Sequence, residues 1–110
     1  MNCDALKTDY DRDGFVVVRD FVTGDALAEL RENLDRYIRD IVPTLPETHA
    51  FYQDRSRPET LKQLQCMGGD PYFSEFMNNE HWRSLAVAIL GEEIADVKEP
   101  EWFNKPPNTV

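Results

Sequence analysis

The stretch Thr8–Asp20, "TDYDRDGFVVVRD", decides how the N-terminal part of this chain is built. Aspartates occupy every second position from Asp9 to Asp13, and Gly14 follows them directly. One interpretation is purely structural: a polar helix ends at Asp13, and Gly14 adopts the left-handed conformation that commonly ends helices. The sequence "FVVVRDF" at 15–21 would then be the first strand, because consecutive β-branched valines favour strands over helices.

The alternative interpretation is a calcium loop of the EF-hand type at residues 9–20. That template asks for oxygen ligands at its first, third and fifth positions, glycine at the sixth and a bidentate carboxylate at the twelfth. The spacing fits, with Asp20 at the last position in place of the longer glutamate. An EF-hand would also need a helix from Val17 to about residue 28, which the valines and the Thr-Gly pair disfavour. We therefore expect the helix-to-strand arrangement and keep calcium binding as the weaker alternative.

Length and charge exclude several classes of protein. A chain of 110 residues suffices for one domain with its own core. It carries 21 acidic and 12 basic residues, for a formal net charge of -9. Nucleic acids and anionic membranes are not expected partners, because both require a concentrated basic face.

Cysteine and histidine usage argues against a disulfide framework and against a zinc site. The two cysteines, Cys3 and Cys66, have no CxxC partner, and His49 and His81 show no ligand spacing. The N-terminus lacks the basic and apolar regions of a signal peptide, and no apolar run approaches the roughly 20 residues needed to span a bilayer. We expect a cytoplasmic, reducing setting.

The clearest helix pattern covers about Gly24–Val42. Its apolar residues recur at spacings of three and four and form one stripe: Leu27, Leu30, Leu34, Tyr37, Ile38 and Ile41. Thr23 is placed to cap the start, and Pro43 lies just beyond the end. On the solvated side the spacing predicts two i,i+4 ion pairs, Glu32 with Arg36 and Asp35 with Arg39.

The rest of the chain predicts shorter elements. In chain order they are a loop at about 43–60, a strand at 61–67, a helix that begins at Pro71 after the N-cap Asp70, a helix at 81–90 that ends at Gly91, and a last strand within 102–105. The order is helix, strand, long helix, loop, strand, two helices, strand. The predicted fold class is α+β with three or four short strands.

Taken in order, three stretches resemble a known family: "YDRDGFVVVRDFVTGDALAELRENLDRYI", "LQCMGGDPYFSEFMNNEHWRSLAVAILGEEI" and "FNKPPNT". The chain resembles the N-terminal portion of the phytanoyl-CoA dioxygenase family, which are oxygenases dependent on non-haem iron(II) and 2-oxoglutarate. The resemblance implies the helix-rich N-terminal part of a double-stranded β-helix, or jelly roll. It also implies oxidative decarboxylation of 2-oxoglutarate coupled to hydroxylation of a small-molecule substrate.

The resemblance stops short of the iron ligands. Relatives continue from the "NKPP" region into an HxD or HxE pair, with a second histidine later, and these three side chains hold the iron. Here His49 is followed by Ala50-Phe51 and His81 by Trp82-Arg83. We therefore expect residues 1–110 to be a single partial domain that is inactive alone. Fe(II) and 2-oxoglutarate would belong to the full-length parent, and none is expected on this chain.

Three residues match cosubstrate-contacting positions of relatives. Lys62 resembles a lysine that contacts 2-oxoglutarate, a dianion that suits an ammonium partner. Asn104 and Glu101 match positions that line the pocket; an amide can donate to a carboxylate, whereas the carboxylate of Glu101 would repel it. The alternative is a non-catalytic interaction module. A partial domain also exposes strand edges and apolar surface, which favour a homo-oligomer.

Overall fold

The structure is a computed structural model that describes residues 2–91 and 100–107. Its helices are α1 (Cys3–Asp13), α2 (Gly24–Arg36), α3 (Pro71–Met77) and α4 (Glu80–Leu90), and its strands are β1 (Ala50–Tyr52), β2 (Leu61–Leu64) and β3 (Trp102–Phe103). Short helical turns cover Tyr37–Ile41, Val42–Thr44, Pro58–Thr60 and Met67–Gly69. The predicted α+β class is confirmed.

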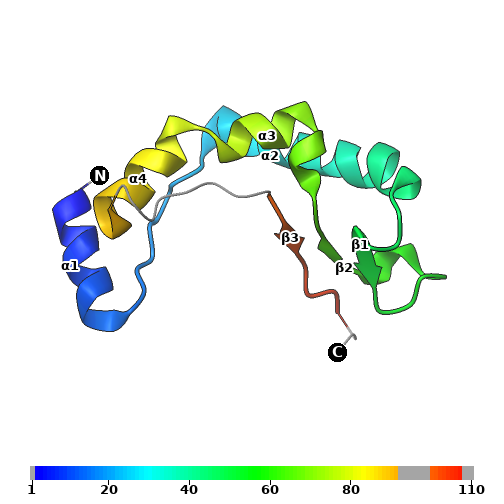
Figure 1. Cartoon of the computed structure of the whole chain (residues 1–110), viewed down its shortest axis with the longest axis horizontal. Coiled ribbons are helices and arrows are strands. Elements are labelled where there is room, and N and C mark those ends of the chain that lie inside the picture. Colours follow the sequence, from blue (N-terminus) through cyan, green and yellow to red (C-terminus); the bar gives the residue numbers. More distant parts are fainter. Residues whose placement is uncertain (1, 92–99, 108–110) are drawn as a thin grey trace.

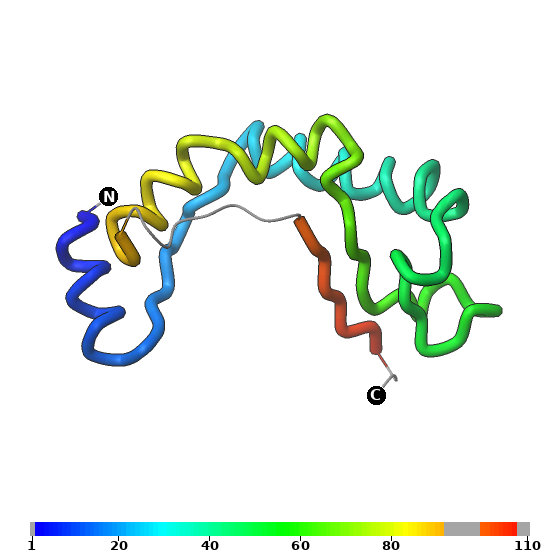
Figure 2. The backbone as a smooth tube through the Cα atoms, in the orientation of Figure 1, coloured from blue at the N-terminus to red at the C-terminus, as the bar shows by residue number. Residues whose placement is uncertain are grey.

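The elements form an open arch (Figure 1). The helices α2, α3 and α4 make its upper curve, α1 and the segment after it form one leg, and the sheet forms the other leg. Figure 2 traces the backbone through the two legs and the curve between them. The radius of gyration is 16.2 Å, whereas a compact domain of this length has about 13 Å. The chain exposes 8012 Å² of surface, and a globular monomer of this mass exposes about 6300 Å². The described fold therefore leaves much more surface uncovered than a closed domain would.

The sheet is antiparallel in the order β1-β2-β3. One row across it consists of Ala50, Leu64 and Trp102, and the neighbouring row consists of Phe51, Gln63 and Phe103. Adjacent rows point to opposite faces. Ala50 and Leu64 are buried, while Phe51 and Phe103 are exposed. One face of the sheet therefore meets the core, and the other presents two phenylalanines to solvent.

The core lies where the end of α2, the sheet and the start of α3 meet. Its buried cluster is Tyr37, Val42, Ala50, Leu61, Leu64, Met67 and Phe73. The Tyr37 ring packs edge-on against Phe73, with centroids 5.4 Å apart. The other leg is held differently: α1 buries no residue, and Lys7 donates from Nζ to the Ile89 carbonyl of α4 at 3.4 Å.

The helix-to-turn prediction at the N-terminus is confirmed. The helix α1 ends at Asp13, and Gly14 has φ 80° with its N–H donating to the Tyr10 carbonyl at 2.8 Å. The strand predicted at 15–21 is wrong, because this segment pairs with no strand in the described part of the chain. A strand needs a hydrogen-bonded partner, and the sheet stands in the opposite leg (Figure 1).

The long helix predicted at about Gly24–Val42 is confirmed in position, and only its last part, Tyr37–Ile41, differs in helical type. The helix α2 ends at Arg36, and the chain continues as a π-helical turn over Tyr37–Ile41. Pro43 lies beyond both, as predicted, within a 3₁₀ turn over Val42–Thr44. Thr23 occupies the N-cap position but its side chain makes no capping hydrogen bond. The pattern gave the apolar stripe correctly, and it could not reveal the change in helical pitch.

Both predicted i,i+4 ion pairs are wrong. Arg36 does not pair with Glu32; it donates two hydrogen bonds to Asp70, at 3.0 and 2.9 Å. Arg39 pairs with its neighbour Asp40 at 2.9 Å and not with Asp35. A partner that is distant in sequence but held nearby by the fold offers Arg36 a bidentate geometry, which is stronger than a solvated pair on one helix.

The remaining predictions hold in outline. The predicted loop at 43–60 contains β1 and two 3₁₀ turns, because three residues are too few for a strand pattern to be visible in sequence. Asp70 caps α3 by accepting from the Phe73 N–H at 3.4 Å, and Gly91 ends α4. The strand predicted at 61–67 shortens to four residues and the last strand to two.

Candidate functional site

The sheet brings together two of the three residues that the sequence analysis predicts to contact a cosubstrate. The Asn104 N–H donates to the Lys62 carbonyl at 2.8 Å, so these residues lie next to each other where β2 meets the chain after β3. Glu101 lies before Trp102, at the opposite end of β3, and is exposed. The candidate site therefore contains Lys62 and Asn104, and Glu101 is separated from them.

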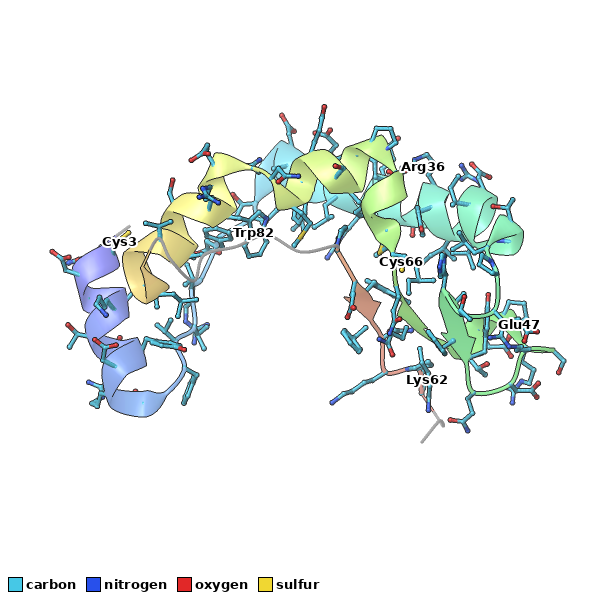
Figure 3. All side chains as sticks on the ribbon, viewed as in Figure 1. Cys3, Arg36, Glu47, Lys62, Cys66 and Trp82 are labelled. Carbon is cyan, nitrogen blue, oxygen red and sulfur yellow. The ribbon has the colours of Figure 1, made fainter. Side chains whose placement is uncertain are left out.

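A bulge lies at Lys62. The pairing of β1 with β2 passes from Phe51 opposite Gln63 to Tyr52 opposite Leu61, which leaves Lys62 as the extra residue in β2. Such bulges bend a strand, change the direction of a side chain and occur frequently beside active sites. The Lys62 side chain is half-buried and labelled near the lower end of the sheet (Figure 3).

The Asn104 side chain already has one partner. Its Nδ2 donates to the Leu61 carbonyl at 3.1 Å, a contact that fastens the chain after β3 to β2. An amide has two N–H donors and an acceptor oxygen, so one bond of this kind leaves donor capacity for a ligand carboxylate.

A polar hollow of about 560 Å³ lies beside β1, and the sequence analysis does not predict it. It is lined by Gln53, Asp54, Arg55, Arg57, Glu59, Thr60 and Pro107. Its two cations are already engaged: Arg57 pairs with Glu59 at 2.9 Å, and Arg55 donates to the Ala50 carbonyl at 2.7 Å. Hydrogen bonds from Ser56 lower the pKa of Asp54, so this carboxylate is firmly ionised. Lys62 and Asn104 do not line this hollow.

The aspartates of the N-terminal stretch do not form a loop around an ion. Asp9, Asp11 and Asp13 belong to α1, and Asp20 lies beyond it. Within α1, Arg12 bonds to Asp9 at 3.2 Å and to Asp13 at 2.8 Å. The hydrogen bond from Arg12 lowers the pKa of Asp13. Among the residues that the structure describes, no group of three or more His, Cys, Asp or Glu side chains is placed to hold a metal.

Comparison with models of protein families, with curated proteins and with solved structures finds no match. In residues 2–91 and 100–107, none of the helices is both long enough and apolar enough to cross a membrane.

Proposed function

We propose that these residues form the helical layer and first strands of an oxygenase of the phytanoyl-CoA dioxygenase type, dependent on iron(II) and 2-oxoglutarate. The observation that carries the proposal is the two-sided character of the sheet. One face packs on the core, and the other bears Phe51 and Phe103, which are 37% and 69% exposed. A jelly roll covers such a face with a second sheet about 10 Å away.

In this proposal Lys62 and Asn104 contact the cosubstrate. Lys62 supplies a positive charge to a carboxylate of 2-oxoglutarate, and the bulge in β2 aims its side chain. Asn104 donates a second hydrogen bond from the adjacent position. Glu101 stays outside this pair, and the iron ligands lie outside residues 1–110, since neither His49 nor His81 begins an HxD or HxE.

The experiment starts from the reading frame that encodes these residues. We expect it to continue past Val110 into an HxD or HxE pair with a later histidine. The full product should form succinate from 2-oxoglutarate only with Fe(II). A frame without these ligands, or a full product that makes no succinate with Fe(II), overturns the proposal.

Two matched variants test the cosubstrate contact. Lys62→Ala should raise the KM for 2-oxoglutarate about tenfold or more, because one charge-assisted hydrogen bond is worth about 1.5–3 kcal/mol. Lys105→Ala removes an exposed lysine from the segment after β3 and should leave that KM unchanged. Equal effects of the two substitutions would contradict the assignment of Lys62.

A second candidate function is a non-catalytic module that self-associates. The same exposed row of Phe51 and Phe103 favours it, because a second copy could cover that face. The two candidates differ in what covers the sheet: further strands of the same domain in the first, and an identical chain in the second.

A further inference from the structure

A continuous strip of aromatic rings lies where α2, α3 and α4 meet. Successive ring centroids are 4.0 Å apart for His81 and Phe21, 4.8 Å for Phe21 and Trp82, 5.6 Å for Trp82 and Phe76, and 6.2 Å for Phe76 and Tyr72. These rings line a groove of about 520 Å³, and Trp82 in it is well separated from Lys62 (Figure 3). Trp82 lies on α4 beside the segment that leads into α2 (Figure 3).

Local structure explains why the rings gather. Tyr72 and Phe76 are four residues apart on α3 and therefore share one face. Phe21 belongs to the segment before α2 and is fixed to α4 by His81, whose Nε2 lies 2.7 Å from the Phe21 carbonyl oxygen and whose ring stacks on the Phe21 ring. Trp82 contacts two of these rings and still has 39% of its surface exposed.

The rim of the groove is negatively charged. Asp20, Glu29 and Glu75 line it, and neither lysine nor arginine does. Within the described residues these three carboxylates form no ion pair. The pKa of Tyr72 is raised by burial and, to a smaller extent, by the negative charge of Glu29, which agrees with a carboxylate close to the aromatic strip.

We propose that this groove binds a small organic cation that carries a quaternary ammonium group. A cation over the face of Trp, Tyr or Phe is attracted by the negative face of the ring, and alkyl groups on the nitrogen contact the rings directly. The carboxylates of Glu29 and Glu75 supply the opposite charge. The groove is within the usual size range of small-molecule sites, about 300–1,000 Å³. The same carboxylates repel anionic ligands, and a neutral ligand would gain nothing from them.

Choline is a suitable probe, and 3,3-dimethylbutan-1-ol is its neutral isostere. In the 110-residue chain the two indole N–H signals of Trp82 and Trp102 can be followed separately by NMR during each titration. Choline should shift the Trp82 signal saturably, with a Kd on the order of millimolar, and leave Trp102 unchanged. The isostere should bind at least about fivefold more weakly. Equal binding of both probes, or no saturable shift of Trp82, overturns the proposal.

Matched charge variants on α2 localise the effect. Glu29→Gln removes a carboxylate of the groove, whereas Glu32→Gln removes one from the same helix outside it. Both variants change net charge equally, so only a local contact can separate them. The first should weaken choline binding about threefold and the second should not change it. Equal effects of the two variants overturn the proposal, and a circular dichroism melt of each variant confirms folding. The assay uses no 2-oxoglutarate, so its outcome is independent of the proposed oxygenase function.

Discussion

The contact between Arg36 and Asp70 gives the sharpest test of how this fold is held together. Arg36 is the last residue of α2, and Asp70 precedes the first residue of α3. Both carboxylate oxygens accept a hydrogen bond from the guanidinium, and this interaction is the largest reason why the pKa of Arg36 is raised. The pair therefore joins two helices that are 34 residues apart in sequence.

The cost of breaking this pair follows from its exposure. The side chain of Asp70 is 9% exposed and that of Arg36 is 32% exposed. A hydrogen bond to a charged group contributes about 1.5–3 kcal/mol, and water can partly replace Asp70 around the more exposed arginine. We expect Asp70→Asn to lower the free energy of unfolding by about 2 kcal/mol, because asparagine keeps the N-cap. Asp70→Ala also loses the cap, which adds about 1 kcal/mol.

Thermal melts measure both variants. A loss of about 2 kcal/mol corresponds to a fall in Tm of about 8–16 °C for a small domain. Asp40→Asn is the control, because Asp40 also pairs with an arginine but is 51% exposed, so its Tm should hardly change. If Asp70→Asn and Asp40→Asn shift the Tm equally, the Arg36 contact does not stabilise the fold and the argument from exposure fails.

Three further predictions concern the cap, alkaline pH and self-association. Gly14→Ala should cost about 1 kcal/mol, because φ is 80° at Gly14, whereas Gly69→Ala, where φ is not positive, should leave the Tm nearly unchanged. Burial raises the pKa of Tyr37, so folding favours the neutral phenol. Its contribution to the free energy of unfolding is fully present below pH about 10 and is lost as pH rises further. Tyr37→Phe should therefore reduce the fall in Tm between pH about 9 and 11, whereas Tyr10→Phe should not. Light scattering should give a mass above 12.8 kDa, because Phe51 and Phe103 are exposed, and a clean monomer would contradict this.

The sequence predicts helices here because each carries its own signals. The apolar stripe of α2, the Asp70-Pro71 start of α3 and the glycine after α4 are all local, and all appear in the structure. The bidentate contact of Arg36 is invisible to the same reasoning, because its partner is brought close only by the folded core. The π-helical turn at Tyr37 is missed for a different reason, because the apolar stripe continues through it without a break.

The candidate sites follow the same division. Lys62 was predicted from a resemblance, and only strand pairing shows that it lies at a bulge next to Asn104. The aromatic groove gave no signal in sequence apart from Tyr72 and Phe76 at helical spacing, which is equally typical of a core. Phe21 and Trp82 are 61 residues apart and meet only in the folded chain.

The wrong strand at 15–21 and the open shape of the molecule have one physical cause. Phe15 and Val17, two residues apart, are 64% and 63% exposed, so the apolar side of a strand pattern is present without anything to cover it. Phe51 and Phe103 likewise form an exposed apolar row on the sheet. An alternating pattern encodes a surface for burial as well as a backbone conformation, and the conformation forms only when a neighbouring strand supplies its hydrogen bonds. Both legs of the arch therefore carry apolar surface that the contacts among the described residues leave uncovered.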